Sequence, residues 1–337
     1  DNMVGPSVEL PATLGIATPK TNNCDLKTKG WELTIGWQDR TNFGMGYGIK
    51  FNVSDARTYI DRYPGNPTNS VGTGTYIAGR EIGEIWGFET VGIAKTDAEM
   101  QAHLDKVGGQ NALGSIWAAG DIMYADQDGK PGITKGAQTL EDHGDLKVIG
   151  NNTPRYHFGL DLNANYKGFD VRLFFQGVMK RDYWQGSNIF WGVGQWGMWW
   201  STGLKEHENY FRDEPVGLAG HEIAANINSY YARPRFDSTQ NQETQTRYLQ
   251  DASYIRLKNF QLGYTLPASM IRKIGITNCR IFVSGENLWT GTKLSKLFDP
   301  ETISGGNTDS NASAPIKSAG NAYPLSRTWS FGLSVSL

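Results

Sequence analysis

An aspartate-rich segment is the first stretch of the sequence whose spacing suggests chemistry. Asp126, Asp128 and Gly129 are spaced like the start of a calcium-binding loop, in which alternate side chains supply hard oxygen ligands. The next ligand position holds Lys130, Pro131 follows it, and no glutamate stands at the distance where such loops place their last ligand. We therefore favour a turn in which the aspartates accept backbone hydrogen bonds, and we expect no metal ion and no cofactor.

The densest aromatic patch of the chain lies between residues 184 and 200. Aromatic faces stack on sugar rings and anchor protein interfaces, so the patch could contact a ligand or a partner protein. Its spacing fits neither a regular strand nor a regular helix. Large aromatic side chains are more often buried packing or anchors at a lipid interface, so both interpretations stay open. The six members are Trp184, Phe190, Trp191, Trp196, Trp199 and Trp200.

Catalysis and nucleic-acid binding find little support. Carboxylate pairs such as Glu81 with Glu84 are common by chance, and no catalytic triad order, zinc-ligand spacing or phosphate-binding loop stands out. The 32 basic and 34 acidic side chains leave a net charge of −2, and the adjacent basic pairs are isolated. We expect a protein that is not an enzyme and does not bind nucleic acid.

Strands with alternating side chains are the elements that would position these residues. Between Tyr156 and Tyr166 every even position is apolar or aromatic, and every odd position is small or polar. The alternation lasts about 11 residues, the length of a tilted strand that crosses a bilayer. The C-terminal stretch Arg327–Leu337 alternates in the same way. One face of such a strand suits lipid, and the other suits the polar interior of a barrel.

The hairpin predicted at residues 154–179 supplies candidate lining residues for that interior. Their side chains could form hydrogen bonds with a passing ligand, although enclosed polar groups more often satisfy one another. The candidates are His157, Asp161, Asn163, Asn165, Asp170, Arg172 and Gln176.

The remaining sequence predicts about seven strands joined by alternately short and long connections. Residues 1–26 are predicted to be loop, and a capping box at Thr96 and Glu99 predicts one helix. A bulge near Lys258 would reconcile the two phases of one strand. The predicted strands are 31–38, 43–53, the two arms of 154–179, 253–265, 280–289 (whose outward phase stays undecided) and 327–337.

Three long connections, 54–153, 180–252 and 290–326, fall on one side of this sheet, as extracellular loops do in bacterial outer-membrane barrels. Seven is an odd number, whereas bacterial single-chain barrels have even numbers of strands. We therefore infer that the fold is all-β and that residues 1–337 form the C-terminal part of a larger transmembrane β-barrel. Cys24 and Cys279 would lie at opposite ends of the barrel wall, so we expect both thiols to be free.

Several stretches together resemble the C-terminal barrel region of SusC/RagA-type TonB-dependent outer-membrane transporters of Bacteroidetes. They occur in the order of that family and span nearly the whole chain. The stretches are TNNCDLKTKGWELTIGWQDR, GDIMYADQDGKPG, LKVIGNNTPRYHFGLDLNANYKGFDVRLFFQGV, ASYIRLKNFQLGYTLP, VSGENLWT and YPLSRTWSFGLSVSL.

The resemblance implies the last third of a 22-stranded barrel in the outer membrane, with a plug domain and TonB box that this chain does not include. It implies active nutrient uptake of glycans or peptides, energised through TonB, with a SusD-like surface lipoprotein as a lid. The alternative is a soluble or surface-tethered β-sandwich that binds carbohydrate through its tryptophans, and a weaker third possibility is a glycoside-acting enzyme.

Overall fold

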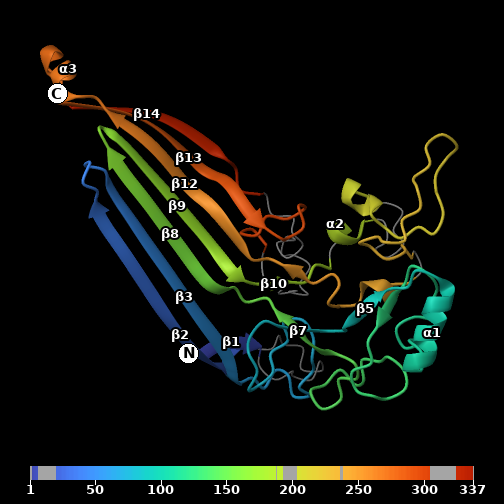
Figure 1. The fold of residues 1–337 in the computed structure, drawn as a ribbon. Coiled ribbons are helices and arrows are strands. Elements are labelled where there is room, and N and C mark those ends of the chain that lie inside the picture. The colour runs from blue at the N-terminus through green and yellow to red at the C-terminus, as the bar shows by residue number, and fades with distance from the viewer. Residues whose placement is uncertain are drawn as a thin grey trace.

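The computed structural model describes residues 2–6, 20–186, 188–192, 203–235, 238–303 and 324–336. These residues form two parts, which Figure 1 shows side by side. One part is a long, inclined antiparallel sheet, which we call the wall. The other is a body of packed connections beyond one end of the sheet, which we call the loop body; it comprises residues 63–154, 181–186, 188–192, 203–235, 238–253 and 293–303.

The wall contains eight strands in the order β1-β2-β3-β8-β9-β12-β13-β14, and every neighbouring pair is antiparallel. Seven are long and correspond to the seven predicted strands, while β1 is short. Their bounds are β1 Asn2–Pro6, β2 Lys20–Arg40, β3 Gly46–Arg62, β8 Arg155–Tyr166, β9 Phe169–Lys180, β12 Tyr254–Thr265, β13 Asn278–Thr292 and β14 Thr328–Ser336.

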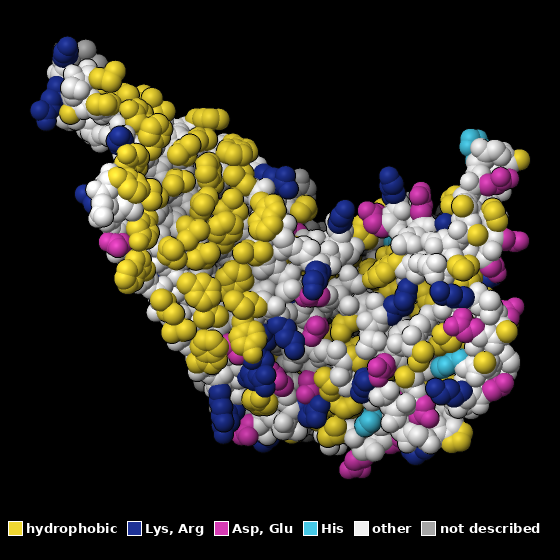
Figure 2. Space-filling view, in the orientation of Figure 1, with side chains coloured by type: hydrophobic (Ala, Val, Ile, Leu, Met, Phe, Trp, Pro, Cys, Tyr) yellow, Lys and Arg dark blue, Asp and Glu magenta, His cyan; other side chains and the backbone are white. Residues whose placement is uncertain are grey.

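The register places the apolar positions of neighbouring strands opposite one another. Leu33 pairs with Val53, and Leu160 pairs with Phe175, so the side chains of each pair leave the same face of the sheet. This face is uncovered: Trp37 is 63% exposed and Phe331 84% exposed. Figure 2 shows the resulting apolar belt across the wall. The β-sandwich alternative is therefore wrong, because a sandwich buries this face against a second sheet.

A bulge at Lys258 reconciles the two apolar phases of β12, as predicted. Leu257 pairs with Phe175 of β9, whereas Asn259 pairs with Phe174, so Lys258 is the extra residue. The neighbouring strand β13 pairs Ile281 with Leu333 of β14. The odd-numbered positions of β13 around Ile281 therefore face the belt. This settles which side chains of this strand point outward, a question that the sequence left undecided.

The strands extend further toward the loop body than predicted. Residues 20–26, predicted as loop, belong to β2, and residues 2–6 pair with them as β1. Strand β3 continues to Arg62 instead of ending near Val53. The alternation that reveals a strand in the sequence ends where one face stops meeting an apolar medium, but backbone pairing continues beyond that point.

Short turns join the strands at the end of the wall opposite the loop body. Lys167 and Gly168 turn the chain between β8 and β9, both with positive φ, as the hairpin prediction requires. Between β12 and β13 the chain forms two short helices, α3 Ala268–Ile271 and η5 Arg272–Ile274. Figure 1 places α3 at this far end.

The loop body has its own secondary structure. The predicted helix is α1 Asp97–Val107: the Glu99 backbone N–H donates to Oγ1 of Thr96 over 3.1 Å, and Gly108 ends the helix in the left-handed conformation. The remaining elements are β4 Glu84–Gly87, β5 Thr90–Ile93, β6 Ile122–Tyr124, β7 Lys147–Asn151, β10 Asp182–Tyr183, α2 Asn188–Trp191, η3 Lys205–Glu208, η4 Gln240–Gln242 and β11 Gln250–Asp251.

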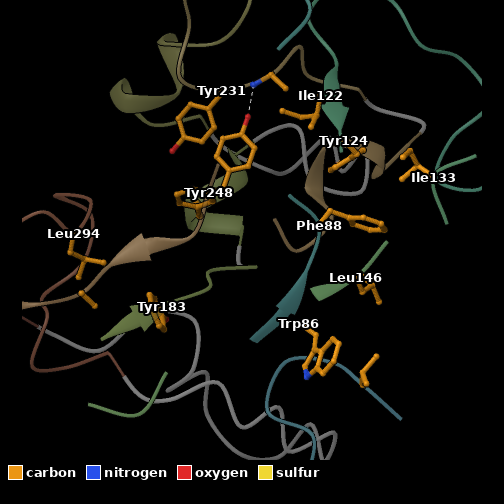
Figure 3. Packing of buried hydrophobic residues seen from close by; sticks show 14 of the residues in the cluster. Trp86, Phe88, Ile122, Tyr124, Ile133, Leu146, Tyr183, Tyr231, Tyr248 and Leu294 are labelled. Carbon is orange, nitrogen blue, oxygen red and sulfur yellow. Dashed lines mark hydrogen bonds between the residues drawn. The ribbon is translucent and has the colours of Figure 1, made fainter. Parts of the chain in front are cut away.

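One hydrophobic core unites the three long connections. Phe88 and Tyr124 come from the first connection, Tyr248 from the second and Phe298 from the third, and all belong to a single buried cluster. Figure 3 shows the labelled members from the first two connections pointing toward a common interior. The sequence prediction treated these segments as separate loops, because their apolar residues follow neither helical nor strand periodicity.

Buried arginines lie where the strands of the wall meet the loop body. The guanidinium of Arg155 forms a bidentate pair with Asp55, and both residues are about 8% exposed. Arg256 of β12 donates over 2.8 Å to Asp299 of the third connection. Arg181 donates to the backbone oxygen of Ile303 over 3.1 Å. Each guanidinium satisfies groups from distant parts of the chain at the point where strands become loops.

Cys24 and Cys279 are both buried and free, as expected. Within the described residues, no helix combines the length and apolarity needed to span a membrane.

An arginine scan can test which face of the wall meets lipid. We expect Ile35→Arg to destabilise the membrane-inserted protein that contains this chain by about 2–4 kcal/mol, because Ile35 lies in the middle of the belt. Thr34→Arg places the same side chain on the opposite face, one residue away, and should cost less than about 1 kcal/mol. Urea unfolding in lipid vesicles measures both, and equal losses would contradict the assignment of the two faces.

Candidate functional site

The predicted lining residues share the face of the wall opposite the apolar belt. Asn163 pairs with Arg172, and Asn165 with Asp170, across the β8–β9 hairpin. A guanidinium nitrogen of Arg172 lies 2.5 Å from a carboxylate oxygen of Asp161. His157 and Gln176 occupy the same face further toward the loop body, where Phe174 and Val178 share it.

Salt bridges and flat-lying amides cover this polar face. Asp170 also pairs with Arg280 of β13, a contact that the sequence prediction missed. Cβ atoms added to Gly48 and Gly159 would lie 2.8 Å from the amide of Asn163 and 2.6 Å from that of Asn52. The glycines therefore leave room for neighbouring amides to lie flat, which keeps the surface low in relief.

The described part of the aromatic patch divides into core and rim. Phe190 is fully buried, with its ring centroid 5.5 Å from that of Tyr231, so it packs within the hydrophobic core. Trp184 and Trp191 are half-buried, with ring centroids 6.2 Å apart. Trp196, Trp199 and Trp200 lie outside the described residues.

Tyrosines that the sequence prediction missed complete the cluster around Trp191. The ring centroid of Tyr248 lies 4.9 Å from that of Trp191, and its hydroxyl accepts a 2.7 Å hydrogen bond from the Ala232 backbone N–H (Figure 3). Burial raises the pKa of Tyr248, so its hydroxyl stays neutral. The adjacent tyrosines in the segment YYARPR, residues 230–235, were the available sequence signal.

A cavity of about 800 Å³ adjoins this cluster, and Trp191, Tyr210 and Tyr231 are among its lining residues. Its volume is in the range that holds a small organic ligand. Charged side chains make up much of the remaining lining. They are Lys205, Glu208, Arg212, Asp213, Glu214, Arg233 and Arg235.

Several cavity cations are already positioned by partners. Arg235 donates to the fully buried carboxylate of Asp121 over 2.8 Å and 2.5 Å. Arg233 lies 2.6 Å from Asp213, and its guanidinium carbon is 5.3 Å from the centroid of the Phe211 ring. The cavity therefore presents fixed charges of both signs beside aromatic faces, a combination suited to a ligand with polar or charged groups along an extended backbone.

The aspartate-rich segment brings three carboxylates together, one of which the sequence prediction missed. Ligand oxygens of Asp126, Asp128 and Asp145 all lie within 4.8 Å of one another. Asp128 accepts from the Lys130 backbone N–H over 2.9 Å, and the Lys130 ammonium lies 3.2 Å away. That N–H, together with the ammonium, holds the pKa of Asp128 below its usual value.

Backbone N–H groups donate hydrogen bonds to the other two carboxylates. Asp126 accepts from Gly129 over 2.7 Å. Asp145 is fully buried and accepts from Gln127 over 2.8 Å and from Thr134 over 2.7 Å. These contacts fit the hydrogen-bonded turn preferred from the sequence better than a calcium loop, in which a cation would take the place of the ammonium.

Removing the Asp145 carboxylate should loosen this turn. We expect Asp145→Ala to cost about 1.5–3 kcal/mol, because two backbone N–H groups lose a charged, buried acceptor. Hydrogen exchange at the amides of Gln127 and Thr134 should accelerate accordingly. Asp128→Ala, which removes a carboxylate from the exposed rim of the same turn, is the matched control and should leave both amides protected. Equal acceleration in the two variants would contradict the structural role of Asp145.

The known proteins to which the chain is similar in sequence are of one class. No protein-family model matches the chain. It is 27% identical to TonB-dependent receptor P3 and 25% identical to TonB-dependent receptor P26 of Formosa agariphila, over 97% and 98% of its length. It spans about 30% of the length of these curated relatives. The chain therefore resembles part of the TonB-dependent receptors.

Solved structures narrow the resemblance. The structure of the RagAB peptide transporter covers 97% of the chain with a TM-score of 0.60 and 20% identity, and the chain covers 31% of that protein chain. The open-open state of the RagAB peptide importer covers 100% of the chain with a TM-score of 0.58 and 21% identity. The resemblance to the SusC/RagA type and the all-β barrel fold are thus confirmed. These matches name receptors and a transporter, in agreement with the expectation of a non-enzymatic protein.

Proposed function

We propose that this chain forms the C-terminal part of the barrel of an active importer, which carries an oligosaccharide or oligopeptide across the outer membrane. The observation that carries the proposal is the division of the molecule. The wall has an exposed apolar belt on one face, and the long connections gather at one end in a body with a ligand-sized cavity. A protein that both spans a membrane and takes up a solute needs these two features on the same chain.

The loop body would lie outside the cell, where it meets the ligand first. A SusD-like lipoprotein would cover it, and a plug and TonB, acting through the rest of the receptor, would open the barrel. The ligand would then pass along the polar face lined by His157, Asp161, Asn163, Asp170, Arg172 and Gln176. Fixed ion pairs such as Arg172–Asp161 leave few unsatisfied charges there to retain the ligand.

The cavity lining favours a ligand that carries charge. Lys205 and Glu214 line the same cavity as Trp191, and neither forms an ion pair with another described residue. Opposite charges of this kind match the ionised groups of an oligopeptide, or the acidic groups of a charged oligosaccharide, better than a neutral sugar. The relation to a peptide transporter in fold points in the same direction.

Mild detergent extraction of outer membranes tests membrane location and partners together. Native separation followed by mass spectrometry should find peptides of this chain in a band that also contains a plug domain and a lipoprotein. Recovery of the chain in the soluble fraction, without such partners, would contradict the importer.

Two tryptophans of the loop body offer a matched test of the cavity. Trp191 lines the cavity, whereas Trp184 is a half-buried neighbour that is not among its lining residues. Trp191→Ala should lower uptake of a charged oligopeptide by roughly tenfold, the loss typical of an aromatic contact at the centre of an interface. Trp184→Ala should stay within about twofold of the wild-type rate, because it removes a comparable packing contact without touching the cavity.

Uptake of labelled oligopeptides and neutral oligosaccharides should be measured in cells whose only copy of the receptor is the variant. Equal uptake rates in the two tryptophan variants would contradict a role of the cavity in transport. A loss of uptake confined to the neutral oligosaccharide would contradict the proposal of a charged ligand but would agree with the proposal of import.

A further inference from the structure

A cluster of cations lies directly beyond the apolar belt, on the same face of the wall. Lys27 and Lys29 of β2 and Arg57 of β3 are all exposed. Lys29 pairs with Arg57 across the two strands, and Lys27 pairs with Tyr59. Figure 2 shows basic side chains gathered where the belt meets the loop body.

The register fixes the depth of this cluster relative to the belt. Along β2 the belt begins with Trp31 and ends with Trp37, both more than half exposed. Tryptophan marks the boundary between the hydrocarbon and head-group layers. Lys29 stands two residues beyond Trp31, about 7 Å along the strand, and therefore lies at the level of lipid head groups.

The positive charge of the cluster is not cancelled by its own surroundings. Asp55 is held by Arg155 in a bidentate pair, and the same guanidinium lies 3.7 Å from Glu81. Asp61, further along the same face, forms no ion pair within the part of the chain that the structure describes. Arg57 forms a hydrogen bond with Tyr59 and is attracted by Glu81, whereas Lys27 and Lys29 form no ion pair with any described residue.

The Lys29–Arg57 pair by itself lowers the stability of the sheet. Like charges directly opposite one another on neighbouring strands destabilise a sheet, and their Cα atoms lie only about 5 Å apart. An anion placed between the two side chains would remove this repulsion. A phosphate group is a good fit, because the guanidinium can bind two of its oxygens while ammonium groups approach the remaining ones.

We propose that Lys27, Lys29 and Arg57 form a binding site for the phosphate-bearing head group of a lipid in the leaflet on the side of the long loops. The site rests on the proposed function only in requiring the wall to be inserted in a membrane. The apolar belt contacts the acyl chains, and the cluster binds the phosphate, so one lipid molecule meets both parts of the surface. Bound lipid also relieves the repulsion between β2 and β3.

The test uses the full receptor that contains this chain, inserted in nanodiscs of phosphatidylcholine with a minor fraction of phosphatidic acid. Native mass spectrometry after gentle release counts the lipids that stay bound. Wild type should retain phosphatidic acid in preference to phosphatidylcholine, and the Lys27→Gln, Lys29→Gln, Arg57→Gln variant should retain at least tenfold less. Lys167→Gln, Arg272→Gln, Lys273→Gln, which removes the same charge at the opposite end of the wall, should behave as wild type.

Equal retention of phosphatidic acid by wild type and the first variant would overturn the site, as would equal retention of the two lipids by wild type. Inorganic phosphate should not displace the lipid. Displacement at millimolar concentration would overturn the lipid site and show that the cluster binds free anions instead. If the triple variant fails to fold, as judged by heat-dependent mobility in gels, single Lys29→Gln provides the same comparison. A receptor that never enters the nanodisc would contradict the proposed function instead.

Discussion

The uncovered apolar face of the wall is the constraint on which the rest of the molecule depends. Side chains such as Trp37 and Phe331 are largely exposed on a sheet that is one layer thick, and water would oppose that arrangement. Lipid removes the penalty and at the same time demands that every backbone polar group be paired within the sheet. The long antiparallel strands, the short connections at one end and the position of the long connections at the other end follow from that demand.

The strands were predictable because a sheet with an apolar medium on one face and a polar medium on the other requires side chains that alternate between apolar and polar. The strand from Tyr156 to Tyr166 and the bulge at Lys258 were both visible in the sequence for this reason. The strand ends were not, since Lys20–Leu26 and Ser54–Arg62 no longer separate an apolar from a polar medium. Their pairing depends on backbone hydrogen bonds, which carry little information about side-chain type.

The candidate site was less predictable than the wall. Trp184 and Trp191 stood out by composition, but Tyr210, Arg233 and Arg235 become part of the same cavity only after residues far apart in sequence have packed together. Asp145 joins Asp126 and Asp128 in the same way, from 17 residues beyond the second of them in an otherwise irregular segment. Contacts of this kind leave no periodic trace, so single-sequence reasoning finds some members and misses others.

The shared core of the loop body has a consequence for the order of assembly. Phe88 belongs to the first long connection, whereas Phe298 follows β13, so the cluster that contains both is incomplete until nearly all of the wall has been placed. Folding of the loop body is thereby coupled to completion of the wall, through contacts with very large sequence separation. An incompletely inserted chain would display an unfinished hydrophobic cluster, a difference that quality-control proteases and chaperones can recognise before the protein reaches its working state.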